Sequence, residues 1–144
     1  MVLYLDASLL VKRYIQETGT EQVNSLFNQF SVFGTSLISR AEVAAALKKA
    51  VCVKVINKEE AKKALMEFRS EWEMFFRLPI TETLITRADS LSWDYDLRGY
   101  DSVHLAAAIL WQESIQKQVT IATYDRQLWK AAAEVGLAIY PDNL

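Results

Sequence analysis

Short apolar runs alternate along the chain with longer segments in which apolar residues recur at helical spacing. The first run, Val2–Leu5, is apolar without strict alternation, which is typical of a strand buried on both faces. Further strands are predicted at residues 35–38, 119–123 and 137–140. Strands separated by helices require right-handed crossovers between parallel neighbours. The pattern therefore predicts a three-layer α/β/α fold with a central parallel sheet of four to five strands.

The predicted helices begin and end at capping residues, glycines and prolines. Asn57 with Glu60 three residues later matches a capping box, and a proline limits the far end, so one long helix is predicted over residues 58–77. Its apolar stripe faces the core, whereas Met66 and Met74 lie on the opposite side and suit either a protein contact or helix packing. The other predicted helices cover residues 7–16, 20–30, 39–53, 81–94, 101–116 and 126–135.

Composition fits one enzyme domain spanning residues 1–144, because 51% hydrophobic content supplies a core. The formal net charge of -2 argues against a protein that coats nucleic acid through overall positive charge. Cys52 is the only cysteine, so no internal disulfide or Cys-rich zinc site can form, and a reducing compartment fits best. Asp6 follows only four apolar residues, too few for a signal peptide or a membrane span. We therefore expect a cytoplasmic protein without a membrane partner.

Four acidic residues lie where the predicted sheet would bring them together. Asp6, Glu42 and Asp125 each come after a predicted strand. Asp101 opens an alanine-rich helix. Because the carboxyl ends of parallel strands share one edge, these carboxylates can converge on one crevice. A bound divalent cation would relieve their mutual repulsion and keep them ionised at neutral pH.

Each acid also has a local structural interpretation. Asp6 and Asp125 stand at strand-to-helix junctions, where aspartate is a favoured N-cap. Glu42 lies three residues after Ser39 and matches an S-x-x-E capping box. Asp101 could be an early-turn acid at the positive end of its helix. The occurrence of all four at one predicted edge favours a metal site, and capping is compatible with that role.

Missing motifs narrow the chemistry. His104 is the sole histidine, which excludes a zinc site with several histidines. The four glycines form neither a Walker A loop nor a dinucleotide-binding fingerprint, and no G-x-S-x-G elbow is present. An all-oxygen carboxylate site suits Mg²⁺ or Mn²⁺ and phosphodiester hydrolysis. His104 lies three residues after Asp101 and has either a structural role or a place in the hydrogen-bond shell of the site.

Four segments, in this order, carry a family resemblance: 6–8 (DAS), 39–42 (SRAE), 97–108 (LRGYDSVHLAAA) and 123–126 (TYDR). They resemble the PIN-domain ribonucleases, above all the VapC-like toxins of type II toxin–antitoxin systems. By this resemblance the family's acidic quartet, which holds one or two Mg²⁺ or Mn²⁺ ions, consists of Asp6, Glu42, Asp101 and Asp125. The resemblance covers essentially the whole chain.

Several neighbouring residues gain candidate roles. Ser8 and Thr123 fall where the family often has a hydroxyl beside the metal site. Lys12, Arg13 and Arg98 flank the quartet in sequence and are candidates to hold RNA phosphates, although solvated surface charge explains them equally well.

The resemblance also implies activity and partners. It implies an endoribonuclease that hydrolyses RNA phosphodiester bonds through a metal-activated water. A cognate antitoxin would lay a segment into a groove near the active site, and the toxin would form a homodimer.

Two other functions remain open from the sequence. A phosphoryl-transfer or receiver-like domain would phosphorylate a strand-end carboxylate such as Asp6. It is the weaker alternative, because Ser8 stands where a haloacid-dehalogenase-like phosphatase would place its second aspartate. A catalytically inactive PIN-like binding module would keep partner binding after Asp101→Asn and show no metal-dependent cleavage.

Overall fold

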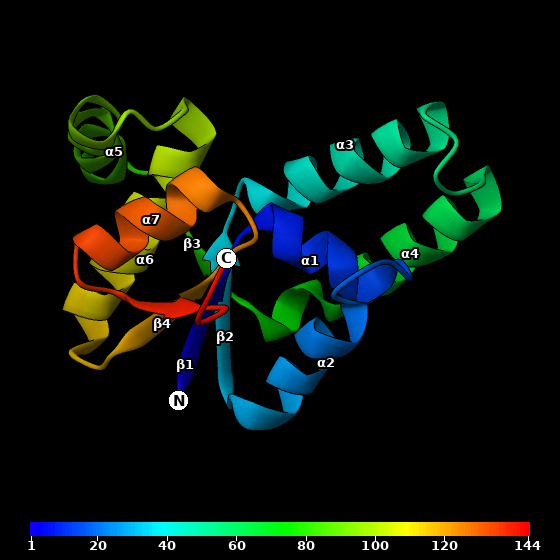
Figure 1. Cartoon of the computed structure of the whole chain (residues 1–144), viewed down its shortest axis with the longest axis horizontal. Coiled ribbons are helices and arrows are strands. Elements are labelled where there is room, and N and C mark those ends of the chain that lie inside the picture. Colours follow the sequence, from blue (N-terminus) through cyan, green and yellow to red (C-terminus); the bar gives the residue numbers. More distant parts are fainter.

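A five-stranded parallel sheet forms the centre of the molecule, in the strand order β3-β2-β1-β4-β5 (Figure 1). The computed structural model describes residues 1–144. The strands are β1 (Val2–Leu5), β2 (Val32–Ser36), β3 (Phe76–Leu78), β4 (Val119–Ala122) and β5 (Ala138–Tyr140). This architecture confirms the predicted three-layer α/β/α fold with a parallel sheet.

Helices cover both faces of the sheet. On one face lie α1 (Ala7–Tyr14), α2 (Thr20–Gln29), α3 (Ser39–Cys52) and α4 (Lys58–Glu71). On the other face lie α5 (Glu82–Tyr95), α6 (Gly99–Ile115) and α7 (Arg126–Glu134). In Figure 1, α3 and α4 extend together to one side, away from α5, α6 and α7. None of these helices combines the length and the apolar character needed to cross a lipid bilayer.

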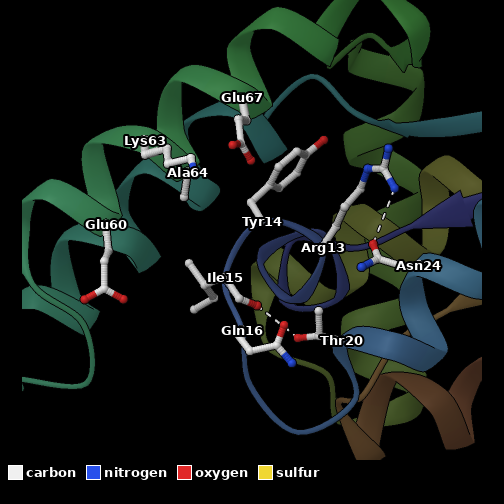
Figure 2. A pocket seen from close by; sticks show the side chains of 10 residues that line it. All are labelled: Arg13, Tyr14, Ile15, Gln16, Thr20, Asn24, Glu60, Lys63, Ala64 and Glu67. Carbon is white, nitrogen blue, oxygen red and sulfur yellow. Dashed lines mark hydrogen bonds between the residues drawn. The ribbon is translucent and has the colours of Figure 1, made fainter.

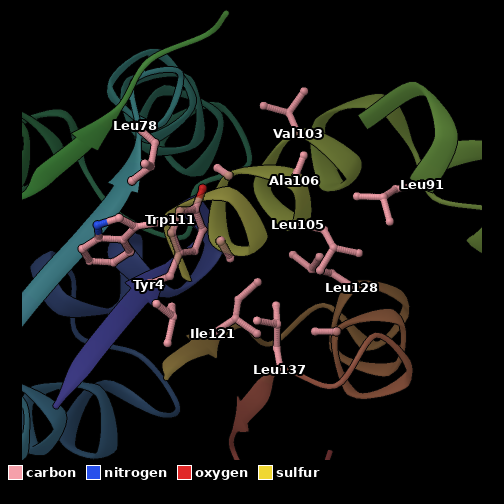
Figure 3. Close-up of a cluster of buried hydrophobic side chains, with 14 of the residues drawn as sticks. Tyr4, Leu78, Leu91, Val103, Leu105, Ala106, Trp111, Ile121, Leu128 and Leu137 are labelled. Carbon is pink, nitrogen blue, oxygen red and sulfur yellow. The ribbon is translucent and has the colours of Figure 1, made fainter. Parts of the chain in front are cut away.

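Side chains of β1 alternate between two hydrophobic cores. Val2 and Tyr4 face the core formed with α5, α6 and α7, whereas Leu3 and Leu5 face the core formed with α1 to α4. Figure 3 shows the first core, in which Trp111 of α6 lies close to Tyr4. A strand with both faces covered needs no polar face, which explains why β1 is a continuous apolar run.

The prediction of one long helix over residues 58–77 is wrong for its last six residues. The capping box of Asn57 and Glu60 is present, but α4 ends at Glu71. A 3₁₀ turn, η1 (Trp72–Met74), follows it, and β3 then pairs with β2 at the edge of the sheet. The backbone hydrogen bonds of this pairing override the helical spacing of the aromatic residues, which is only a weak local preference.

The segment predicted as a strand at residues 35–38 is shifted. Strand β2 covers Val32–Ser36, and its register places Gly34 opposite Tyr4 of β1. The remaining predicted elements differ from the observed bounds by no more than two residues. Apolar spacing located these elements because each buries one face or both.

Candidate active site at the carboxyl edge of the sheet

Asp6 follows β1 directly and is held by four hydrogen bonds. Its Oδ1 accepts the Leu9 backbone N–H at 2.9 Å, so Asp6 is the N-cap of α1. The Ser8 hydroxyl lies 2.8 and 2.9 Å from the two carboxylate oxygens, and Thr123 Oγ1 donates to Oδ2 at 2.5 Å. Burial raises the pKa of the Asp6 carboxyl, while these hydrogen bonds oppose the rise. No lysine or arginine pairs with this buried carboxylate.

Asp125 occupies the equivalent place after β4. Pairing of Leu5 with Ala122 puts the ends of β1 and β4 side by side. Asp125 Oδ1 accepts the Leu128 backbone N–H at 2.9 Å and caps α7. Its own backbone N–H donates to Thr123 Oγ1 at 3.0 Å, and the Thr123 hydroxyl in turn donates to Asp6. One hydroxyl therefore connects two of the predicted ligands.

Asp101 lies in the first turn of α6 and meets Asp125 through a shared cation. Arg98 Nε donates to Asp101 Oδ2 at 2.9 Å, and Arg98 Nη2 donates to Asp125 Oδ2 at 2.8 Å. Burial raises the pKa of the Asp101 carboxyl and the negative charge of Asp125 adds to the rise, while the bond from Arg98 opposes it. The Arg98 side chain is 71% exposed, so this cation reaches the two carboxylates from solvent.

Glu42 does not cap its helix, and the capping-box interpretation is wrong. The N-cap of α3 is Ile38, which makes no side-chain capping bond, and the Ser39 hydroxyl lies 2.7 Å from Thr35 Oγ1. Glu42 Oε1 instead lies 2.7 Å from His104 Nε2. The Glu42 side chain therefore points across to α6, where the buried imidazole of His104 requires a hydrogen-bond partner.

Hydrogen bonds through two intervening side chains connect three of the four predicted acids, while Glu42 is bonded to His104 alone. Thr123 links Asp6 with Asp125, and Arg98 links Asp125 with Asp101. His104 forms a hydrogen bond with Glu42. It also lies near Asp6 and Asp101, and its charge would lower the pKa of both carboxyls. No three of the chain's acidic, histidine or cysteine side chains lie in an arrangement that could hold a metal ion as they stand.

The chemistry of this donor set fits a hard divalent cation. All four candidate ligands are carboxylates, the donors that Mg²⁺ and Mn²⁺ prefer. Asp6 is a buried carboxylate without a basic partner, so a cation beside it would offset its raised pKa. The Arg98 guanidinium pairs with both Asp101 and Asp125, so these two carboxylates already share one positive charge.

Lys12 and Arg13 have partners within the protein. Lys12 Nζ donates to the Thr18 carbonyl oxygen at 2.8 Å. Arg13 pairs with Glu71 of α4 at 2.9 Å, and its guanidinium lies 3.7 Å from the Phe27 ring centroid. Of the three basic residues predicted to hold RNA, only Arg98 directly contacts the acidic site.

A groove lies between α1, α2 and α4 at the far end of α1 from Asp6 (Figure 2). Both signs of charge line it, including Arg13, Glu60, Lys63 and Glu67. Figure 2 shows Arg13 turned toward Asn24 of α2, to which it donates a hydrogen bond. The groove is thus polar and separate from the carboxylates.

Comparison with known proteins decides the family. The PIN domain model matches residues 3–134 of the chain. The chain belongs to the PIN domain family. This membership confirms the resemblance seen in the sequence and leaves the receiver-like alternative without support.

This PIN domain is similar in sequence to ribonucleases and similar in fold to chains of solved toxin–antitoxin complexes. It is 29% identical over 143 residues to Ribonuclease VapC45 of Mycobacterium tuberculosis (strain CDC 1551 / Oshkosh), covering 99% of this chain and 97% of that protein. A toxin–antitoxin complex from Klebsiella pneumoniae has a similar fold, with a TM-score of 0.67 at 19% identity over 94% of this chain and 93% of that chain. VapBC2 from Rickettsia felis, bound to a promoter DNA fragment, gives 0.65 at 15% identity over 96% and 97%.

Sequence reasoning missed one group beside the site of this PIN domain. Tyr4 was an apolar strand residue in the sequence, yet its hydroxyl lies 2.7 Å from His104 Nδ1. A signal was present, because a tyrosine in a strand buried on both faces needs a hydrogen-bond partner for its hydroxyl. The sequence left His104 with either a structural role or a place in the hydrogen-bond shell of the site. It has both, since it is buried and also contacts Glu42.

Proposed function

We propose that this PIN domain is a metal-dependent endoribonuclease and the toxin of a toxin–antitoxin pair, acting as one nuclease unit over residues 1–144. The observation that carries the proposal is the placement of four carboxylates, two after β1 and β4 and two on α3 and α6, beside Thr123, Arg98 and His104. The ribonuclease relative that matches almost the whole chain supports RNA as the substrate.

The acidic quartet would hold one or two Mg²⁺ or Mn²⁺ ions. Its members are Asp6, Glu42, Asp101 and Asp125. When bound, the metal supplies a water of lowered pKa and stabilises charge that develops on the phosphate oxygens. Ser8 and Thr123 fix the rotamer of Asp6, which keeps its oxygens directed to the shared edge.

Arg98 is the proposed RNA-binding residue nearest the chemistry. Its exposed guanidinium would leave Asp101 and Asp125 when a metal ion takes their oxygens, and would then bind an RNA phosphate. RNA contacts by Lys12 and Arg13 remain predictions. Lys12 would first have to leave Glu17, and Arg13 would have to leave Glu71.

The proposed partners are a cognate antitoxin and a second copy of the chain, and the proposed location is the cytoplasm. The polar groove between α1, α2 and α4 suits an antitoxin segment with charges of both signs, although it is separate from the carboxylates and not the groove near the active site that the resemblance implies (Figure 2). Met66 on α4 is 69% exposed and Met74 is 44% exposed, which leaves both available for a protein contact. An apolar hollow lined by Ile38, Ile85 and Tyr100 supports a homodimer face.

Incubation of purified protein with single-stranded and structured RNA tests the activity. Cleavage should require Mg²⁺ or Mn²⁺ and stop with chelator. Asp6→Asn and Asp101→Asn should each lower the cleavage rate at least about a hundredfold, because each removes a charged ligand. Asp94→Asn on the exposed end of α5 is the matched control and should cleave like the wild type.

Two outcomes would contradict the proposal. Cleavage that survives chelation and both substitutions would remove the metal mechanism. Wild-type protein that cleaves no RNA with either metal, yet still binds a protein partner, would favour the inactive binding module.

A further inference from the structure

We propose that Tyr4 and His104 are positioning residues that hold the Glu42 carboxylate ready to bind the metal ion. The inference rests on the proposed function and adds residues outside the acidic quartet. The three side chains come from β1, α6 and α3, and they form one continuous line of hydrogen bonds.

The inner part of this line is sealed from solvent. Tyr4 is fully buried, and His104 is 2% exposed. Tyr4 Oη lies 2.7 Å from His104 Nδ1, and the ring centroids are 5.9 Å apart in an edge-on arrangement. His104 Nε2 lies 2.7 Å from Glu42 Oε1. Glu42 is the outer end, with a side chain that is 25% exposed at the active-site edge.

The partners fix the direction of the hydrogen bonds. An ionised carboxylate only accepts, so His104 Nε2 carries a proton and donates it to Glu42. The Tyr4 phenol carries an O–H that can donate, and its oxygen lies 2.7 Å from His104 Nδ1. His104 Nδ1 is the acceptor in reach of this proton, and no buried polar side-chain atom lacks a partner. Tyr4 therefore selects the tautomer that donates to Glu42.

Glu42 depends on this contact for its orientation. The hydrogen bond from His104 is the only one that its side chain makes, and α3 has no capping box to hold it. A free glutamate side chain loses about 1.5–2 kcal/mol of rotamer entropy when it is ordered. His104 orders it in advance through one oxygen and leaves the second oxygen for the metal. Outer hydrogen bonds of this kind typically change metal affinity about 10–100-fold.

A purely structural histidine would fill the same space without affecting the metal. Two substitutions at position 104 separate these roles. His104→Gln places an amide N–H near the position of Nε2 and can still donate to Glu42. His104→Asn places its polar atoms near the position of Nδ1, so it can still pair with Tyr4 but does not reach Glu42. Both remove the ring, and both leave a polar group in the core.

The test is Mn²⁺ binding measured by calorimetry on the full chain without RNA, together with urea unfolding. His104→Asn should weaken Mn²⁺ binding about 10–100-fold, whereas His104→Gln should stay within about threefold of the wild type, at similar unfolding free energies. Tyr4→Phe removes only the hydroxyl and should weaken Mn²⁺ binding several-fold. In RNA cleavage, added Mn²⁺ should restore the rate of His104→Asn.

The sole histidine gives a second readout, because ¹⁵N labelling of histidine yields one imidazole in the spectrum. Metal-free protein should show a protonated Nε2 and an unprotonated Nδ1, with a shift of the Nδ1 signal in Tyr4→Phe. Equal Mn²⁺ affinities in wild type, His104→Asn and Tyr4→Phe would overturn the positioning role while leaving the nuclease intact. A wild type that binds no Mn²⁺ would overturn both proposals.

Discussion

Individual residues at the edge of the sheet serve local structure and the site at once. Asp6 and Asp125 each cap a helix with one oxygen and turn the other toward a group of the site. An N-cap requires an acceptor near the helix start, and a metal ligand requires a charged oxygen, so aspartate satisfies both. Local and functional interpretations of such a residue are therefore not alternatives.

Burial of Asp6 predicts a pH-dependent stability in metal-free protein. Its pKa is raised in the native state, so that state binds more protons than the unfolded chain between the two pKa values. The contribution of Asp6 to the free energy of unfolding therefore falls as the pH rises through the raised pKa. Urea unfolding over a pH series that starts near the ordinary aspartate pKa of about 4 and continues upward should show Asp6→Asn gaining stability relative to the wild type as the pH rises.

Two measurements test whether the raised pKa of Asp6 causes this pH dependence. A stability difference between wild type and Asp6→Asn that does not change with pH would contradict a raised native pKa. Saturating Mn²⁺ should stabilise the wild type at neutral pH, because an ion that binds only the native state shifts the unfolding equilibrium. The stability that metal-free wild type loses relative to Asp6→Asn should then be recovered.

The residue scale is also where prediction from sequence was least complete. The acids were found because three of them come after apolar strands, a pattern that is visible without coordinates. The contact between Glu42 and His104 was not found, because it joins residues 62 positions apart across two helices. The S-x-x-E pattern pointed to a local partner, and a tertiary hydrogen bond replaced it.

At the scale of elements, one close contact between strand and helix controls the packing of the sheet edge. Gly34 of β2 lies against the ring of Trp111 in α6, and that ring stacks on Phe76 of β3 with centroids 5.4 Å apart. A methyl group at Gly34 would overlap the indole ring. The glycine is therefore needed for close approach and not for a special backbone angle.

Gly34→Ala should consequently destabilise the protein by about 1–3 kcal/mol, the usual cost of overpacking a core. Gly99→Ala is the matched control, because a methyl group there meets no atom within 4 Å. Urea unfolding measures both variants. Equal stability of the two variants would show that Trp111 moves aside without cost.

Prediction of helices and strands succeeded where burial produces a regular spacing of apolar residues, and it failed where burial does not. Strand β1 is buried throughout and helix α6 is buried from Ser102 to Ala108, and both were located from apolar content. Strand β3 has one buried residue, Leu78, and two exposed ones, so it carries no strand period. Its aromatic neighbours happen to continue the helical spacing of α4, which extended the predicted helix by mistake.

At the scale of the whole molecule, the parallel sheet is what assembles the site. Strands β1 and β4 are adjacent at its centre, and helices α3 and α6 add their acids from opposite faces (Figure 1). The chain carries a net charge of -2, and the site itself is acidic, so RNA gains no attraction from the protein as a whole. A divalent ion would offset much of the negative charge of the site and would leave Arg98 available for phosphate.

The central claim is that the four carboxylates share a divalent cation, and anomalous diffraction from crystals grown with Mn²⁺ tests it most directly. We expect an anomalous peak bound by Asp6 and Asp101, with Glu42 and Asp125 contacting the ion directly or through water. Arg98 should then no longer bridge Asp101 and Asp125. An edge without a peak at saturating Mn²⁺, with Arg98 still between its two carboxylates, would contradict the account.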